Sequence, residues 1–145
     1  MTATATQLIQ EFIYSITVDL ELYQTLSSLL REQKSIYLAF DSKALKDNIA
    51  QQMPLLEQLN TNAEKRSLNL RKLGLANDEQ SVQRIFNALP SKLSIKVSNQ
   101  WHSLKRLIND CHQLNQSNGQ SSAAFHEIVF HIKYPAQHTY EEPRF

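Results

Sequence analysis

The most constraining feature of this sequence is a heptad pattern that runs from Leu93 to Ile132. One set of positions recurs every seven residues, and a second set follows three residues after members of the first. The positions are Val97, Leu104, Cys111, Asn118, Phe125 and Ile132, with Leu107, Leu114 and Ile128. This is the a/d pattern of a helix packed lengthwise against other helices. It predicts one helix of about forty residues, which at ~1.5 Å per residue would be ~60 Å long.

The heptad pattern has a polar interruption in its middle. Asn118 occupies an a position and Ser121 a d position, with Gly119 between them. A polar side chain at an a position sets the register of a coiled coil at some cost in stability. Glycine weakens a helix by ~1 kcal/mol. We therefore predict a hinge at residues 118–122.

A second apolar face begins after this interruption, and Leu114 leads into it. The face consists of Phe125, Ile128, Val129 and Ile132. It either packs on the first helix as ordinary core or binds a partner by helix-in-groove docking. We take Leu114, Asn118 and the four residues of this face as the candidate partner-binding site.

The scarcity of turn residues favours few, long helices. The chain of 145 residues has two glycines and four prolines, too few to punctuate a sheet with many turns. Its length is that of one domain. We predict an all-α fold, an antiparallel helical bundle or coiled coil of three long helices plus one short helix. The bundle is expected at residues 1–134, with a flexible C-terminal tail at 135–145.

Apolar residues spaced three and four apart predict a first amphipathic helix from about Gln7 to Lys34. Thr4 or Thr6 can cap this helix. The segment Ser35–Phe40 is compatible with a strand or with a buried helix end. Because no second strand is available to pair with it, we take the helical interpretation.

A second helix is expected to begin after Asp41, a good N-cap, and to reach Leu73. Its apolar stripe consists of Leu45, Ile49, Leu55, Leu56, Leu59, Ala63, Leu70 and Leu73. Pro54 removes one backbone hydrogen bond at a cost of ~3 kcal/mol. We therefore expect a bent helix, or two helices that meet at Met53–Pro54. Gly74 has the position of a C-cap residue, which must tolerate positive φ.

A short helix is predicted from Asn77 to Leu89. Asn77 can cap it, with Gln80 three residues later as in a capping box. Pro90 ends this helix, and Ser91 can cap the long helix that follows.

Several features favour a cytoplasmic protein without membrane insertion. The longest apolar run, Ile36–Phe40, is far shorter than the ~20 residues of a membrane span. Residues 1–7 lack the basic residue of a secretory signal. Cys111 is the single cysteine, so it cannot form an intrachain disulfide.

The charge distribution is uneven although the net charge is only +1. Residues 65–106 carry nine basic and two acidic side chains, whereas residues 1–64 carry four basic and eight acidic ones. A basic segment can be a nucleic-acid footprint. We favour the alternative that these side chains lie against an acidic first helix or face solvent, because aromatic residues are not interleaved with them.

The residues themselves argue against catalysis and against a metal cluster. His126 and His131 are five residues apart, whereas zinc-binding histidines on a helix are four apart. Cys111 and His112 are neighbours and diverge on a helix, so they do not form a nucleophile–base pair. Cys111 lies on the apolar seam and is interpreted as a core residue.

The chain contains Leu73–Gly74–Leu75 and, in its last predicted helix, the stretch LNQSNG at residues 114–119. Together with the leucine spacing of the first two helices, these patterns resemble the FlgN family of flagellar export chaperones. In that family a leucine-rich helical hairpin ends in a Leu-Gly-Leu turn, and a later helix carries a Leu-Asn-Gln-x-Asn-Gly element. The turn corresponds to residues 73–75 here and the element to residues 114–119. The further matching residues are Leu29, Leu30, Leu38, Asp41, Leu45, Leu55, Leu56, Leu59, Arg66, Trp101, Leu104, Leu107 and Cys111. The resemblance covers about residues 26–119.

This resemblance implies a cytoplasmic chaperone that is not an enzyme and needs no cofactor. Such chaperones hold the C-terminal helical segments of flagellar hook-associated (hook–filament junction) proteins. They prevent premature assembly and deliver these clients to the flagellar export apparatus. The candidate partner-binding site then becomes a client-binding site.

The chain departs from the family pattern after Gly119. Many members continue with apolar residues at this point, whereas Gln120, Ser121 and Ser122 follow here. Thr139 and Tyr140 resemble a tyrosine-bearing tail segment that the family uses to dock to the export gate, although the usual glycine after the tyrosine is Glu141. Tyr140 is therefore a candidate docking residue, and a tail without that role is the alternative.

Two other functions remain as alternatives. A structural or regulatory coiled-coil protein would dimerise through the same apolar face, so the free protein is a possible homodimer. A nucleic-acid-binding helical protein would use the basic segment and bind with strong salt dependence. We expect no nucleic-acid partner.

Overall fold

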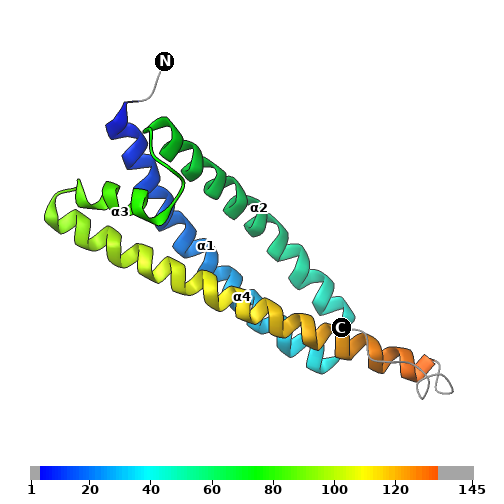
Figure 1. Cartoon of the computed structure of the whole chain (residues 1–145). Helices are drawn as coiled ribbons and strands as arrows, with labels where there is room; N and C mark the ends of the chain where they lie inside the picture. The colour runs from blue at the N-terminus through cyan, green and yellow to red at the C-terminus, as the bar shows by residue number, and fades with distance from the viewer. Residues whose placement is uncertain (1–3, 134–145) are drawn as a thin grey trace.

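The computed structural model describes the backbone of residues 4–133 and the side chains of residues 4–121. Four helices make up this part of the chain: α1 (Ala5–Ala39), α2 (Ser42–Lys72), α3 (Glu79–Asn87) and α4 (Ser91–Lys133) (Figure 1). The described residues contain no strand. The predicted all-α fold of three long helices and one short helix is confirmed. The expected tail, 135–145, lies outside the described residues.

Helix α1 is the centre of the bundle. It packs against both α2 and α4, which make few contacts with each other. The contacts between α1 and α4 join Tyr23 to Cys111 and Leu30 to Asn118, both 88 residues apart. A constant separation means that α1 and α4 run parallel, whereas α1 and α2 form an antiparallel hairpin. The long heptad helix α4 therefore packs on one side of α1 and is not the central helix of the bundle.

Two apolar clusters hold the helices together. The larger one consists of Phe12, Ile16, Leu70, Val82, Ile85, Phe86, Val97 and Leu104, and the smaller one of Leu26, Leu30, Leu59 and Cys111. Trp101 packs on the larger cluster, with ring centroids 6.2 Å from those of Phe12 and Phe86. The a positions of the heptad are buried as far as Asn118. At ~1.5–3 kcal/mol for each buried side chain, these clusters supply most of the attraction between the helices.

Helix α2 presents a different face to α1 from the one its apolar residues predict. The amides of Asn48, Gln52, Asn62 and Asn69 are buried, together with Leu59 and Leu70. Ile49 and Leu56, members of the predicted apolar stripe, are exposed instead. Helix α2 is also one helix that passes through Pro54, so the alternative of two helices is wrong. Three of these amides, those of Asn48, Gln52 and Asn62, bond to groups on α1, which compensates for their loss of water.

The helix ends follow local sequence closely. Thr4 caps α1 in a capping box with Gln7, and Asp41 caps α2. The cap of α3 is Asp78 rather than Asn77, because the Asp78 carboxylate accepts a hydrogen bond from the Ser81 N–H at 2.8 Å. Ser91 is the first residue of α4 and not its cap. The Pro90 carbonyl accepts a hydrogen bond from the Ser94 N–H, so the cap position of α4 is Pro90, one residue before Ser91.

Gly74 has the left-handed backbone that was expected at the end of α2. Its φ is 75°, and the N–H groups of Gly74 and Leu75 donate to the carbonyls of Arg71 and Leu70. These two bonds form a Schellman motif, which satisfies carbonyls at the helix end.

The two glycines provide a matched pair of substitutions. Gly74→Ala should lower the free energy of unfolding by about 1 kcal/mol, because alanine is strained at positive φ. Gly119→Ala should raise it by up to about 1 kcal/mol, because Gly119 is helical. A Cβ meets no atom within 4 Å at either position, so backbone conformation alone sets the sign. Urea unfolding measures both; equal shifts would contradict the assigned backbone conformations.

Helix α3 is attached to α4 by a polar cluster around Glu79. The Glu79 carboxylate accepts hydrogen bonds from Lys105 Nζ at 2.8 Å and Trp101 Nε1 at 3.0 Å. Burial alone would raise the pKa of Glu79, but these bonds and that from Gln83 lower it overall. The pKa of Asp78 is lowered as well, by the hydrogen bonds from Ser81.

Acid should loosen this attachment. A carboxyl whose pKa is lowered on folding stabilises the fold above its unfolded pKa, ~4.3 for glutamate, and loses that contribution as the pH falls through its folded value. Trp101 is the only tryptophan, so its emission should shift as the pH falls below about 4. Glu79→Gln should remove most of this pH-dependent shift. An unchanged titration in Glu79→Gln would assign it to other carboxyls.

Candidate functional site

The three long helices meet in a buried polar network near the end of the bundle where α1 and α2 join. Gln33 of α1 is its centre: Gln33 Oε1 accepts from Gln52 Nε2 of α2 at 3.0 Å and from Asn118 Nδ2 of α4 at 3.3 Å. Asn118 Nδ2 also donates to the Leu30 carbonyl at 2.8 Å. Gln52 in turn donates to Asn48 Oδ1 at 2.7 Å. One side chain of α1 thus links both neighbouring helices.

Asn118 is therefore an internal residue of the bundle. It is 2% exposed, and its amide is bonded to α1, so it does not lie on the partner-facing surface where we expected it. The physical reason is that α1 offers two hydrogen-bond acceptors, the Leu30 carbonyl and Gln33 Oε1, to a polar side chain at this a position. Asn118 Oδ1 has no hydrogen-bond partner among the described residues.

Leu114 also belongs to the packing of the bundle. It is half-buried against the smaller apolar cluster of Leu26, Leu30, Leu59 and Cys111. It lies one turn before Asn118 on α4 and so marks the approach to the far end of the helix. Its partly exposed surface leaves room for a second contact.

The last part of α4 extends beyond the α1–α2 hairpin. Helix α1 ends at Ala39 and α2 begins at Ser42, whereas α4 continues to Lys133. Each residue of α1 lies beside the residue of α4 that comes 88 positions later, so Ala39 is level with residue 127. Figure 1 shows α4 running past the end where the hairpin turns. Residues 118–122, the predicted hinge, are helical without a break.

The other predicted site residues lie outside what the structure describes. Phe125, Ile128, Val129 and Ile132 belong to α4 by backbone, but their side chains are not among the described ones. Tyr140 lies outside the described residues altogether. Their roles stay predictions from the sequence.

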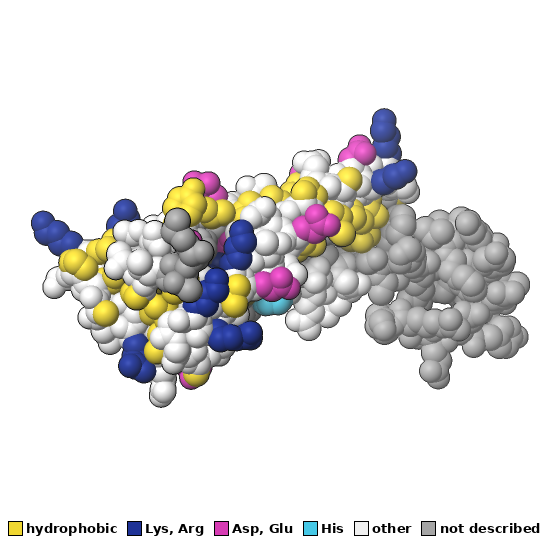
Figure 2. All heavy atoms as spheres, turned by 90° about the horizontal axis from the view of Figure 1, so that it is seen from above, with side chains coloured by type: hydrophobic (Ala, Val, Ile, Leu, Met, Phe, Trp, Pro, Cys, Tyr) yellow, Lys and Arg dark blue, Asp and Glu magenta, His cyan; other side chains and the backbone are white. Residues whose placement is uncertain are grey.

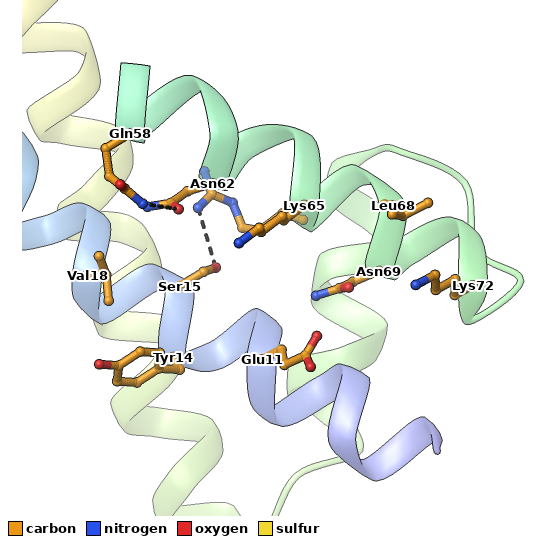
Figure 3. A pocket seen from close by; sticks show the side chains of 11 residues that line it. Glu11, Tyr14, Ser15, Val18, Gln58, Asn62, Lys65, Leu68, Asn69 and Lys72 are labelled. Carbon is orange, nitrogen blue, oxygen red and sulfur yellow. Dashed lines mark hydrogen bonds between the residues drawn. The ribbon is translucent and has the colours of Figure 1, made fainter. Parts of the chain in front are cut away.

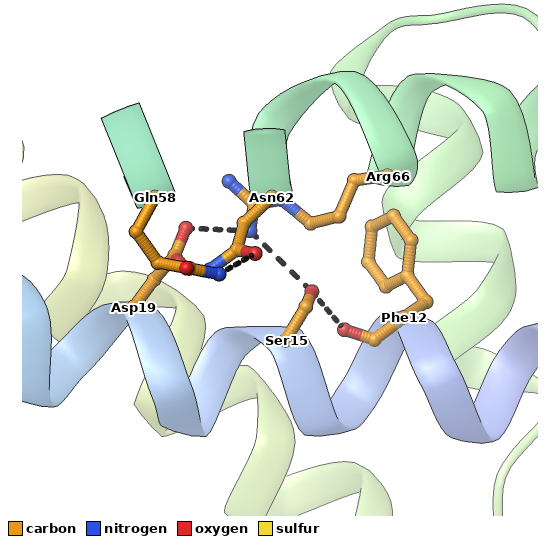
Figure 4. A network of polar contacts seen from close by, with 6 residues as sticks. All are labelled: Phe12, Ser15, Asp19, Gln58, Asn62 and Arg66. Carbon is orange, nitrogen blue, oxygen red and sulfur yellow. Dashed lines mark hydrogen bonds and ion pairs between the residues drawn. The ribbon is translucent and has the colours of Figure 1, made fainter. Parts of the chain in front are cut away.

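A second polar network joins α1 to α2 nearer the start of α1 (Figure 4). Asp19, which is fully buried, pairs with Arg66 Nη1 at 2.6 Å and accepts from Asn62 Nδ2 at 2.7 Å. Arg66 also reaches Ser15 Oγ at 3.4 Å. The sequence contained a signal for this pair, because Asp19 lies on the apolar stripe of the first helix and a charge there needs a buried partner.

The cysteine is not an activated nucleophile. Cys111 is buried, and its Sγ lies 3.8 Å from the Tyr23 carbonyl. Burial raises the pKa of the Cys111 thiol, with Asp110 as a smaller contribution, and burial also raises the pKa of Tyr23. His112 is exposed on the other side of the helix. The described residues contain no group of three potential metal ligands, and no described helix is long and apolar enough to cross a membrane.

The basic segment divides into one internal side chain and an exposed set. Arg66 lies against α1 and is neutralised by Asp19. Lys65, Arg71, Lys72 and Arg84 are exposed. Figure 2 shows many Lys and Arg side chains at the end of the molecule that carries the start of α1 and the end of α2. This arrangement agrees with the interpretation that the basic residues lie against the first helix or face solvent.

Asn118→Asp tests the internal role of this residue. It replaces an amide donor with a carboxylate that faces the Leu30 carbonyl and Gln33 Oε1, so we expect a loss of about 3 kcal/mol in the free energy of unfolding. The control Asn115→Asp, at an exposed position of the same helix, should change stability by less than about 0.5 kcal/mol. Urea unfolding separates the two. Equal stability of both variants would place Asn118 on the surface.

The fold defines the class of protein first: this is a small all-helical bundle. Its three long helices are joined by buried amides, and α4 extends beyond the α1–α2 hairpin. The model of the FlgN protein family matches residues 1–129, and the chain belongs to that family. It is accordingly a flagellar export chaperone and acts in flagellum biogenesis. The comparisons with curated proteins and with solved structures gave no match.

Proposed function

We propose that this protein holds the C-terminal helical segment of a flagellar hook-associated protein in the cytoplasm. It thereby prevents premature assembly and delivers the client to the export apparatus. The observation that carries the proposal is the projection of α4 beyond the α1–α2 hairpin, in a chain that belongs to the FlgN family. The heptad predicts that Phe125, Ile128, Val129 and Ile132 share one face of the last part of α4, which begins beside the end of α1 and continues past it.

The proposed binding mechanism depends on the apolar surface of the client segment. A terminal segment that is amphipathic exposes an apolar stripe when it is not packed, and such stripes associate with one another. Helix-in-groove docking on α4 would cover the stripe until assembly. Leu114, half-buried at the edge of the bundle, would extend the contact toward the smaller apolar cluster.

Delivery requires a contact with the export apparatus as well. Tyr140 is the residue that the family resemblance suggests for docking to the export gate. Tyr140→Ala should then leave client binding unchanged and reduce secretion of the client. Normal secretion would remove Tyr140 from the mechanism.

Direct binding tests the proposal. The full-length protein should co-purify with the C-terminal segment of a hook-associated protein and form a defined complex in light scattering. The competing function is a coiled-coil protein that dimerises through the same face of α4. A tight dimer that stays dimeric when the client segment is added would favour that function and count against the chaperone mechanism.

A further inference from the structure

A groove between α1 and α2 lies outside the proposed client site. It has a volume of about 550 Å³ and is lined by four residues of α1 and seven of α2. On α1 the lining residues are spaced three and four apart from Glu11 to Val18, and on α2 they extend from Gln58 to Lys72. The groove therefore runs along the helices and is not a round pocket. An elongated trough between two helices suits a third helix.

The charges in this groove favour a ligand with carboxylates. Lys65 and Lys72 line it from α2, and neither has a salt-bridge partner within 4.0 Å among the described residues. The third cation, Arg66, is neutralised by Asp19. Lys65 and Lys72 are seven residues apart, which is ~10.5 Å along a helix. Carboxylates seven residues apart on another helix have the same spacing.

A side-chain amide that bonds no described residue also lines the groove. Asn69 is 7% exposed, and its side chain makes no hydrogen bond to the described residues. Figure 3 shows Asn69 and Lys65 reaching from α2 toward α1, with Glu11 and Ser15 on the opposite side. The Asn69 amide atoms are not among the buried polar atoms that lack a partner, so they reach solvent in the groove and can bond a polar group of a ligand.

The remaining lining residues limit the class of ligand. Tyr14 and Leu68 are large apolar side chains at the rim, 69% and 42% exposed. Glu11 contributes a negative charge that would repel a polyanion such as a nucleic-acid backbone. The groove thus combines apolar contacts, one carboxylate and two lysines that form no ion pair with the described residues. A protein helix with mixed side chains meets all three requirements.

We propose that the α1–α2 groove is a second protein-docking site, which takes an amphipathic helix with two carboxylates seven residues apart between apolar side chains. The groove lies toward the start of α1, at the other end of the bundle from the projecting end of α4. A client and this second helix can therefore be held at the same time. The site does not depend on the function proposed for α4.

The test uses the full-length protein and a labelled helical peptide of about 20 residues, long enough to form a helix. The peptide is alanine-based, with two glutamates seven residues apart and leucines between them. A second peptide has glutamine at both positions. Fluorescence anisotropy at low salt should show about tenfold tighter binding of the glutamate peptide. Binding should weaken as salt screens the charges.

The variant Lys65→Glu/Lys72→Glu should weaken binding of the glutamate peptide by at least about tenfold. Lys43→Glu/Lys46→Glu, the same charge change at exposed positions of α2 outside the groove, should not. Both lysines of the groove are exposed, so helical content by circular dichroism should be unchanged. Both double variants should still bind the client segment, which separates this site from the site on α4.

Three outcomes would overturn the proposal. The first is equal binding of the glutamate and glutamine peptides. The second is equal weakening by the two double variants, which would indicate a diffuse charge effect. The third is displacement of the peptide by a nucleic acid that binds the same lysines more tightly, which would assign the groove to nucleic acid.

Discussion

Ile128→Asp is expected to abolish co-purification with a hook-associated protein while the bundle stays folded. Ile128 occupies a d position in the part of α4 that lies beyond the end of α1 at Ala39. An unpaired carboxylate in an apolar interface costs several kcal/mol. Client affinity should therefore fall at least about a hundredfold. The melting temperature of the free protein should change by no more than a few degrees, because the described core lies in the other part of the molecule.

The matched control is Phe130→Asp. Phe130 is at the f position of the same heptad, which faces away from the a/d seam, and the substitution likewise replaces an apolar side chain with a carboxylate. Client binding should persist in this variant. If Ile128→Asp unfolds the protein, Ile128 belongs to the core and the proposed site is wrong. If both variants bind the client normally, α4 is not the client-binding helix.

Arg66→Met should destabilise the bundle by about 3–5 kcal/mol, the usual cost of removing one partner from a buried ion pair. Asp19 is fully buried, and without Arg66 its carboxylate keeps only the hydrogen bond from Asn62. Methionine fills a volume similar to that of the arginine stem, so the loss measures the uncompensated charge rather than a cavity. Urea unfolding followed by circular dichroism gives the change.

Two controls identify the source of this loss. Adding Asp19→Asn to the Arg66→Met chain removes the buried charge and should recover a large part of the lost stability. Lys105→Met breaks the exposed pair with Glu79, whose side chains are 42% and 50% exposed, and should cost less than about 1 kcal/mol. Equal costs for the buried and the exposed pair would contradict the burial of Asp19.

Helices were the most predictable part of this protein. The spacing of apolar residues placed α1 and α4. Gly74 marked the end of α2 and Pro90 the start of α4, whereas the break between α1 and α2 contains neither glycine nor proline. Asp41 and Gly74 were correctly placed at helix ends because caps depend on residues within one turn. The errors at Asn77 and Ser91 were shifts of one residue, where two neighbouring residues could serve as the cap.

The inner face of α2 could not be predicted from periodicity. Hydrophobic spacing assumes that apolar side chains face inward, yet Asn48 and Asn62 are buried while Ile49 and Leu56 are exposed. Asn48 donates to the Leu29 carbonyl and Asn62 to Asp19, both on α1. These acceptors become available to α2 only when the hairpin has formed, so no local pattern reveals them.

The candidate site was likewise predicted only in part from the sequence. The heptad identified Asn118 as the unusual position of the long helix, and Asn118 proved to be a point where α4 is bonded to α1. The sequence could not show whether its amide pointed to a partner or into the bundle. The groove between α1 and α2 was also hidden, because Lys65, Lys72 and Tyr14 come from segments about fifty residues apart.

By itself the sequence determined the helices, most of their ends and the heptad seam of α4, because these depend on interactions within a few turns of one helix. The tertiary structure decided that α1 is the centre, that Asn118 lies inside the bundle and that Asp19 and Arg66 form a buried pair. Each of these depends on groups that lie far apart in the sequence, in the case of Asn118 and Leu30 by 88 residues. Packing selects such contacts by burial and hydrogen-bond complementarity, which a one-dimensional pattern does not contain.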